Sequence, residues 1–164
     1  MANKQSFTPE EWTKVLDSIL AAGLAVSAAD PSGWWGTLKE AAAGTPALAE
    51  AERDPNSNEL IKAVVADFGR SNDGSILAMR ERFARSDPNE CVQRSLANLR
   101  EVSAIVDAKA PDDAAAFKNW LRKISQQVAE ASIEGSFLGF GGVRVSEAER
   151  ATLGDISEAL GVAS

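Results

Sequence analysis

The side chains that could do chemistry in this chain are carboxylates, lysines, serines and one thiol, because the sequence contains no histidine and no tyrosine. Histidine is the usual proton-transfer residue near neutral pH, so Ser-His and Cys-His dyads and imidazole metal sites are excluded. The single cysteine, Cys91, cannot form an internal disulfide, and we expect a structural thiol. We therefore predict a protein without enzymatic activity, with an enzyme built on paired carboxylates as an alternative.

Length and charge limit the fold and the partners. The 164 residues, 45% of them hydrophobic, predict a single domain over 1–164, with 1–7 as a flexible N-terminus. A net charge of −7 and the lack of a basic stripe argue against nucleic acid as a partner. The longest uncharged run, 18–29, is too short for a membrane span, so we expect no transmembrane segment. The lone cysteine and the absence of a signal-like start favour a cytoplasmic setting.

Apolar residues recur at the spacing of helices. The first segment carries them at Trp12, Val15 and Ile19, and further segments repeat the pattern. These are Leu60, Ile61, Val64, Val65 and Phe68; Val92, Leu96, Leu99, Val102 and Val106; and Phe117, Trp120, Leu121, Ile124 and Val128. No segment alternates with a period of two. With the breaks at proline-, glycine- and asparagine-rich stretches, this pattern predicts an all-α bundle of about seven or eight helices and no sheet.

Three capping boxes predict where helices begin. They are Thr8 with Glu11, Asp87 with Glu90, and Ser146 with Glu149. Another stretch, 54–65, starts like a calcium loop, but Glu59 stands where a glycine is required and Val65 where a bidentate glutamate is required. We predict that its asparagines and serine form a turn that leads into the cap of the next helix.

Large apolar residues also stand where the pattern predicts turns. The stretch "GSFLGFGG" places Phe137, Leu138 and Phe140 among glycines, where they either plug the core or remain exposed for docking. Trp34 and Trp35 are neighbours, and neighbours on a helix point about 100° apart. One of the two rings can therefore face the core and the other a partner. We name these five residues as candidate contacts for a protein partner or for self-association.

Two stretches combine a helix, an acidic turn, a cap and a second helix: "AEASIEG…VSEAERATLGDISEALGV" and a fainter copy, "LAVSAADPSGWWGTLKEA". The pattern resembles the TerB-like (tellurite-resistance B) family over about a quarter of the chain. The resemblance implies an all-helical fold in which acids of two turns bind a divalent ion. Carried onto this chain, the ligands of Ca²⁺ or Mg²⁺ would be Asp30, Glu134, Glu147 and Glu149. The first turn departs from the pattern because Pro31 follows Asp30, and the second contains the insertion "SFLGFGG". Glu147 and Glu149 also have a purely structural alternative, because acids suit the first turn of a helix.

These observations lead to three hypotheses of function. The first is a non-enzymatic cytoplasmic helical module for interaction or stress response, TerB-like at least in part. The second is a divalent-metal binding or sensing protein that uses the four carboxylates of the acidic turns. The third is an apolar-ligand carrier with a pocket lined by Trp12, Trp34, Phe117 and Trp120. The chain is also similar to small all-helical bacterial proteins, a likeness that implies no catalytic residues.

Overall fold

The computed structural model describes residues 2–29, 46–70, 87–134 and 147–163, with 131–134 described by their backbone only. Within that part of the chain, 88% of the residues are helical and there is no strand, so the prediction of an all-α bundle is confirmed. The number of helices was wrong: the described residues form six α-helices, not seven or eight. The prediction counted pieces between turn signals, and two of those pieces, 34–43 and 75–85, lie outside the described residues.

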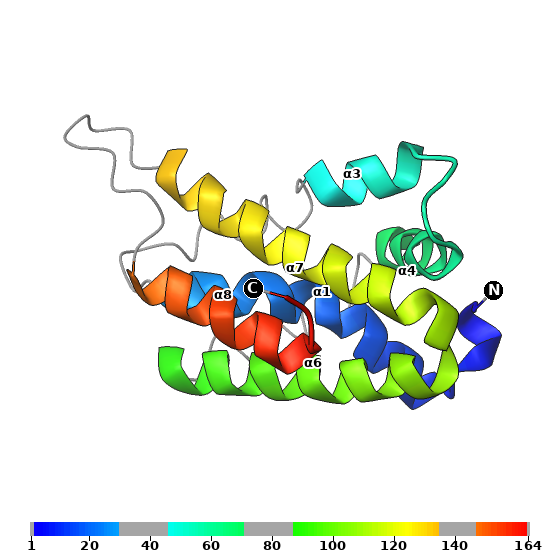
Figure 1. Ribbon diagram of the computed structural model, residues 1–164, viewed down its shortest axis with the longest axis horizontal. Helices are drawn as coiled ribbons and strands as arrows, with labels where there is room; N and C mark the ends of the chain where they lie inside the picture. The colour runs from blue at the N-terminus through cyan, green and yellow to red at the C-terminus, as the bar shows by residue number, and fades with distance from the viewer. Residues whose placement is uncertain (1, 30–45, 71–86, 135–146, 164) are drawn as a thin grey trace.

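The helices follow one another in a simple order. They are η1 (Lys4–Ser6, a 3-10 turn), α1 (Pro9–Ala29), α3 (Pro46–Arg53), α4 (Glu59–Arg70), α6 (Pro88–Lys109), α7 (Pro111–Glu134) and α8 (Glu147–Leu160). The long helices α1, α6 and α7 and the shorter α8 form the main bundle, and α3 and α4 lie beside α7 (Figure 1).

Both helix starts that were predicted within the described residues are capped, but only the first forms the complete capping box. Thr8 Oγ1 accepts a hydrogen bond from the backbone N–H of Glu11 at 3.2 Å, and the Glu11 carboxylate accepts one from the N–H of Thr8 at 2.8 Å. At the start of α6, the Asp87 side chain accepts from the N–H of Asn89 at 2.9 Å. The carboxylate of Glu90 pairs with an arginine one turn further along α6. Short-range sequence signals therefore fix both starts.

α1 is the central helix of the bundle. Every residue from Ser18 to Val26 is buried, because α6, α7 and α8 all pack against this helix. Polar side chains that are buried at this contact bond to backbone carbonyl groups. Ser125 in α7 donates its hydroxyl to the carbonyl oxygen of Ala22 at 2.9 Å, which joins the two helices. The uncharged run at 18–29 therefore belongs to a helix that is buried from 18 to 26 and half-buried at 27–29.

Contacts between the helices show in which direction each helix runs. The N–H of Ala2 donates to Asp113 in the first turn of α7, while Ser125 reaches α1 much nearer its end, so α1 and α7 run in the same direction. α6 runs the opposite way, since Lys109 near its end pairs with Glu11 near the start of α1. α8 runs back along α7 (Figure 1). The ends of α1 and α7 and the starts of α6 and α8 therefore lie at the same end of the bundle, on the left in Figure 1.

The residues before α1 make specific contacts, although the sequence predicted flexibility for 1–7. Phe7 is buried and its ring centroid lies 5.5 Å from that of Trp12. Lys4 pairs with Asp67 of α4 at 2.9 Å, and the N–H of Ala2 donates to Asp113 at 2.9 Å. These contacts connect the N-terminal segment to α1, α4 and α7.

α1 is also long and apolar enough to cross a membrane, if length and composition alone are considered. Of its most apolar 18-residue stretch, 67% is buried inside the protein, and core helices of folded domains pass the same test. A transmembrane segment is therefore not clearly indicated.

Candidate functional site

The acids expected to bind a metal stand next to helix ends that lie together. Glu134 is the last residue of α7, Glu147 is the first residue of α8, and Asp30 directly follows Ala29, the last residue of α1. All three helices have these termini at the same end of the bundle (Figure 1). Asp30 and the side chain of Glu134 lie outside the described residues, as does Ser146, the predicted cap of α8.

The two acids on α8 differ in their surroundings. Glu147 is exposed, whereas Glu149 is 3% exposed and belongs to the buried face of the helix. Residues two apart on a helix do not face one another, so these two carboxylates point in different directions. Among the residues whose side chains are described, no group of three or more histidine, cysteine, aspartate or glutamate side chains could hold a metal ion. Of the predicted ligand set, the structure therefore places Glu147 and Glu149 and does not bring them together.

The five candidate contact residues also fall outside the part of the chain that the structure describes. Trp34 and Trp35 belong to 30–45, and Phe137, Leu138 and Phe140 belong to 135–146. The described helices nevertheless fix where these two segments begin. The first continues from the end of α1, and the second joins the end of α7 to the start of α8, all at one end of the bundle.

Three of the four aromatic residues expected to line an apolar pocket belong to the core. Trp12, Phe117 and Trp120 are all buried. The rings of Phe117 and Trp120 lie 5.8 Å apart between centroids. Both indole N–H groups have partners, namely Asp67 for Trp12 at 3.0 Å and the carbonyl oxygen of Ala47 for Trp120 at 3.1 Å. These rings would be buried in a filled core as well as in a pocket that holds a ligand. Their burial does not distinguish the two, so the carrier hypothesis stays a prediction. Its fourth residue, Trp34, is not described.

Cys91 lies in the first turn of α6 and is fully buried. Burial raises the pKa of its thiol, and the charge of Arg94 opposes that effect only in part. A neutral, buried thiol is a poor nucleophile. The expectation of a structural cysteine is confirmed by this position.

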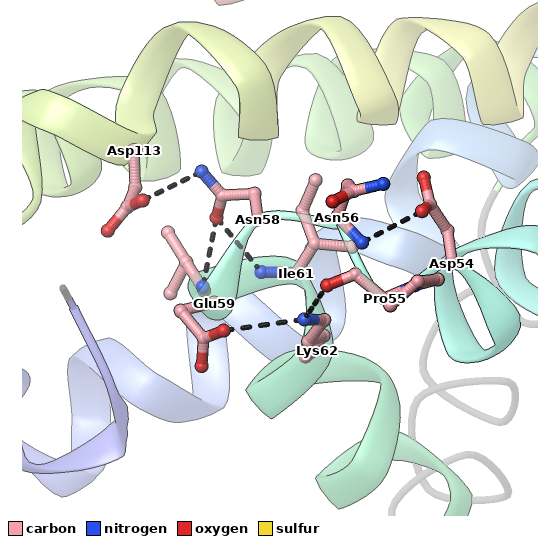
Figure 2. A network of polar contacts seen from close by, with 9 residues as sticks. Asp54, Pro55, Asn56, Asn58, Glu59, Ile61, Lys62 and Asp113 are labelled. Carbon is pink, nitrogen blue, oxygen red and sulfur yellow. Dashed lines mark hydrogen bonds and ion pairs between the residues drawn. The ribbon is translucent and has the colours of Figure 1, made fainter.

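The turn between α3 and α4 is a structural joint, as its sequence predicted. Asn58 caps α4 by accepting from the N–H groups of Leu60 and Ile61 at 2.9 and 3.3 Å. Its amide also donates to Asp113 at the start of α7 at 2.7 Å (Figure 2). Asp54 accepts from the N–H of the second residue after it, which closes the turn. These oxygens serve the backbone, which agrees with the rejection of a calcium loop.

Asp113 is the residue of this joint that the sequence did not single out. One carboxylate oxygen accepts from Asn58 and the other from the N–H of Ala2, so Asp113 connects α7 to the α3–α4 turn and to the N-terminal segment. In the sequence it is one of two acids in the first turn of a helix, a pattern that predicts only a favourable interaction with the helix dipole.

The fold and these sites define an all-α helical bundle protein whose described polar groups mostly serve its architecture. Comparison with protein-family models, with curated proteins and with solved structures finds no match to this chain in any of the three.

Proposed function

We propose that this protein is a non-enzymatic helical module for protein interaction or stress response, TerB-like at least in part, and that it acts in the cytoplasm. Its proposed contact residues are Trp34, Trp35, Phe137, Leu138 and Phe140. The observation that supports the proposal is the position of the helix ends. The segment with the tryptophan pair continues from α1, and the segment with the phenylalanines joins α7 to α8, at the same end of the bundle. Two apolar segments that begin at the same end of the bundle can contribute to one binding surface.

The first test measures whether the tryptophan pair is accessible. Trp12 and Trp120 are buried, so a variant with Trp12→Phe and Trp120→Phe reports on Trp34 and Trp35 alone. Acrylamide should quench the fluorescence of at least one of the two efficiently. The converse variant, Trp34→Phe with Trp35→Phe, serves as the control and should show only protected indoles. If both Trp34 and Trp35 are protected, they are not the contact residues.

A second test distinguishes a docking surface from a core plug in the glycine-rich segment. Phe140→Ser should change the free energy of unfolding by no more than about 0.5 kcal/mol if Phe140 is a surface contact. Removal of a core phenylalanine costs about 3–5 kcal/mol. Phe117→Ala, at a fully buried position, provides that reference in urea unfolding. A loss of similar size at Phe140 would place this ring in the core and remove it from the contact set.

A divalent-metal site at the same end of the bundle is the second candidate function. It is favoured by one observation: Glu134 and Glu147 terminate α7 and α8 there, and Asp30 follows the last residue of α1. Three carboxylates brought together at this end of the bundle would suit a hard cation such as Ca²⁺ or Mg²⁺. Because Glu149 is buried, its carboxylate could bind the ion only if the residues around it moved.

Thermal unfolding of the metal-stripped protein tests this candidate. Ca²⁺, Mg²⁺ or Mn²⁺, added singly, should raise the melting temperature if the folded state binds the ion, and Glu134→Gln should abolish the rise. Glu130→Gln is the matched control, because Glu130 lies one turn earlier on α7, is exposed, and accepts a hydrogen bond from Gln126. An unchanged melting temperature with all three ions would exclude the metal site.

A further inference from the structure

One face of α7 holds the first turn of α3 through the α3 main chain. The indole N–H of Trp120 donates to the carbonyl oxygen of Ala47 at 3.1 Å, and the N–H of Ala47 donates to Oε1 of Gln127 at 2.8 Å. Lys123, which lies between them on α7, pairs with the carboxylate of Glu50. Residues three, four and seven apart share a face of a helix, so the three α7 side chains point to the same side. We name Trp120, Lys123 and Gln127 the α7 clamp.

The α7 clamp recognises features that many helices share. The first N–H groups of any helix lack an acceptor within the helix, and Gln127 supplies one from a different helix. Trp120 bonds to a main-chain carbonyl, which is independent of residue type. Two side chains of α3 matter in addition: Ala47, which is small and 1% exposed, and Glu50, which carries the charge opposite to that of Lys123. The recognised pattern is a helix start with a small residue followed three positions later by an acid.

α3 is a short helix that packs on α4 as well as on α7. It has eight residues, and isolated helices shorter than about 12 residues are marginal in water. Its buried side chains are Ala47, Leu48 and Ala51, of which only Leu48 is large. α4 buries four larger side chains, namely Leu60, Ile61, Val64 and Phe68. Segments with few buried apolar contacts open at a lower free energy than the core of a domain. α3 should therefore open before α4 does.

We propose that α3 is a displaceable occupant of the α7 clamp. It leaves while α1, α6, α7 and α8 stay folded, and the vacated face binds an amphipathic helix of another protein that begins with the same pattern, small-x-x-acid. The chemistry of this partner follows from the segment that fills the α7 clamp in the structure. The partner can bind only after α3 has opened. Its apparent affinity is therefore the affinity for the open form multiplied by the fraction of molecules that are open. The proposal uses no residue of the glycine-rich segment and neither tryptophan of the pair, so it does not depend on the function proposed above.

Hydrogen exchange on the full chain tests the opening of α3. The amides of Glu50 to Arg53 should exchange after a local opening of α3. The free energy of that opening should be lower than the free energy of the opening that exposes amides in the middle of α1 and α7. Gln127→Ala should accelerate exchange in α3 without affecting α1. Gln126→Ala is the control, because Gln126 is bonded to Glu130 and not to α3, and it should leave α3 unchanged. Exchange of α3 only through global unfolding would overturn the proposal.

A peptide tests the vacated α7 clamp. The probe is a fluorescent peptide with the sequence "TPALAEAERD", which is that of α3 and its flanks. It should bind the Glu50→Lys protein more tightly than the wild type, since the lysine introduced into the protein's own α3 would be repelled by Lys123 and that helix would compete less. Gln127→Ala should weaken peptide binding about fivefold. A control peptide carrying Ala47→Leu and Glu50→Lys should bind neither protein. Failure of the probe to bind the Glu50→Lys protein would overturn the proposal.

Discussion

The indole Nε1 of Trp12 in α1 donates a hydrogen bond of 3.0 Å to Oδ2 of Asp67 in α4, and the same oxygen accepts from Lys4 Nζ at 2.9 Å. The side chain of Asp67 is 20% exposed. The hydrogen bond from Lys4 lowers the pKa of Asp67 most, and the bond from Trp12 lowers it further, while burial acts in the opposite direction. Asp67 thus connects the N-terminal segment, the central helix and α4.

A double-mutant cycle measures the contact between Trp12 and Asp67. We expect Trp12→Phe and Asp67→Ala to be coupled by about 1–3 kcal/mol, the range for a hydrogen bond to a charged group. Urea unfolding of the wild type, both single variants and the double variant gives the coupling. A second cycle pairs Trp12→Phe with Asp155→Ala, at an exposed position of α8, and should be additive. Additivity in the first cycle as well would show that the hydrogen bond contributes nothing.

The same carboxylate makes stability depend on pH. Because the pKa of Asp67 is lower in the folded than in the unfolded protein, its contribution is present above the unfolded value of about 3.9 and disappears as the pH falls through the lower folded value. Between about pH 5 and about pH 2, the wild type should therefore lose more free energy of unfolding than Asp67→Asn. Urea unfolding at a series of pH values checks this. Parallel curves for the two proteins would contradict the expectation.

The capping box at the start of α1 can be tested with two threonines near the start of the helix. Thr8→Ala removes the acceptor for the N–H of Glu11 and should destabilise the protein by about 0.5–2 kcal/mol. Thr13 donates its hydroxyl to the carbonyl oxygen of Pro9 within the helix and is exposed. Thr13→Ala should be neutral, or stabilising by up to about 0.5 kcal/mol, since alanine favours helix. Equal losses at both positions would show that the cap has no special role.

Two glycines of the last helix should respond to alanine in opposite ways. Gly161 ends α8 at φ 68°, and the N–H of Val162 donates to the carbonyl oxygen of Ser157 at 3.0 Å, as in a Schellman motif. Gly161→Ala should cost about 1 kcal/mol, because a side chain strains that backbone conformation. Gly154 lies within α8, and an added Cβ would meet no atom within 4 Å. Gly154→Ala should stabilise the protein by about 0.5–1 kcal/mol, as thermal unfolding would show. A gain at Gly161 would refute this assignment of the helix end.

The thiol of Cys91 should react only when the protein unfolds. It is fully buried, and burial raises its pKa, so both access and ionisation oppose the reaction. The rate of modification by a disulfide reagent should follow urea-induced unfolding, and its logarithm should rise in Thr8→Ala in proportion to the stability lost. Fast modification of the folded wild type would show that α6 opens locally at its start. Cys91→Ala, which cannot react, controls for other reactive groups.

Much of the fold could be predicted from local sequence signals. Thr8 with Glu11 and Asp87 with Asn89 mark helix starts through bonds between residues two or three apart, which do not depend on the packing of distant helices. The periodic apolar residues lie on helices as predicted, and most of them are buried, including the whole set on α7. The total number of helices was less predictable, because a turn signal marks a boundary and does not show that each piece between boundaries is a helix.

By itself, the sequence determined that the chain is helical, where its main helices begin, which faces are apolar and that histidine chemistry is impossible. Only the tertiary structure decided which distant polar groups meet. Asp67 with Trp12, Asp113 with Asn58, and Gln127 with Ala47 are separated by 55, 55 and 80 residues, respectively. No periodicity encodes such pairs, because each depends on how whole helices pack, and helix packing follows from the summed burial of apolar faces.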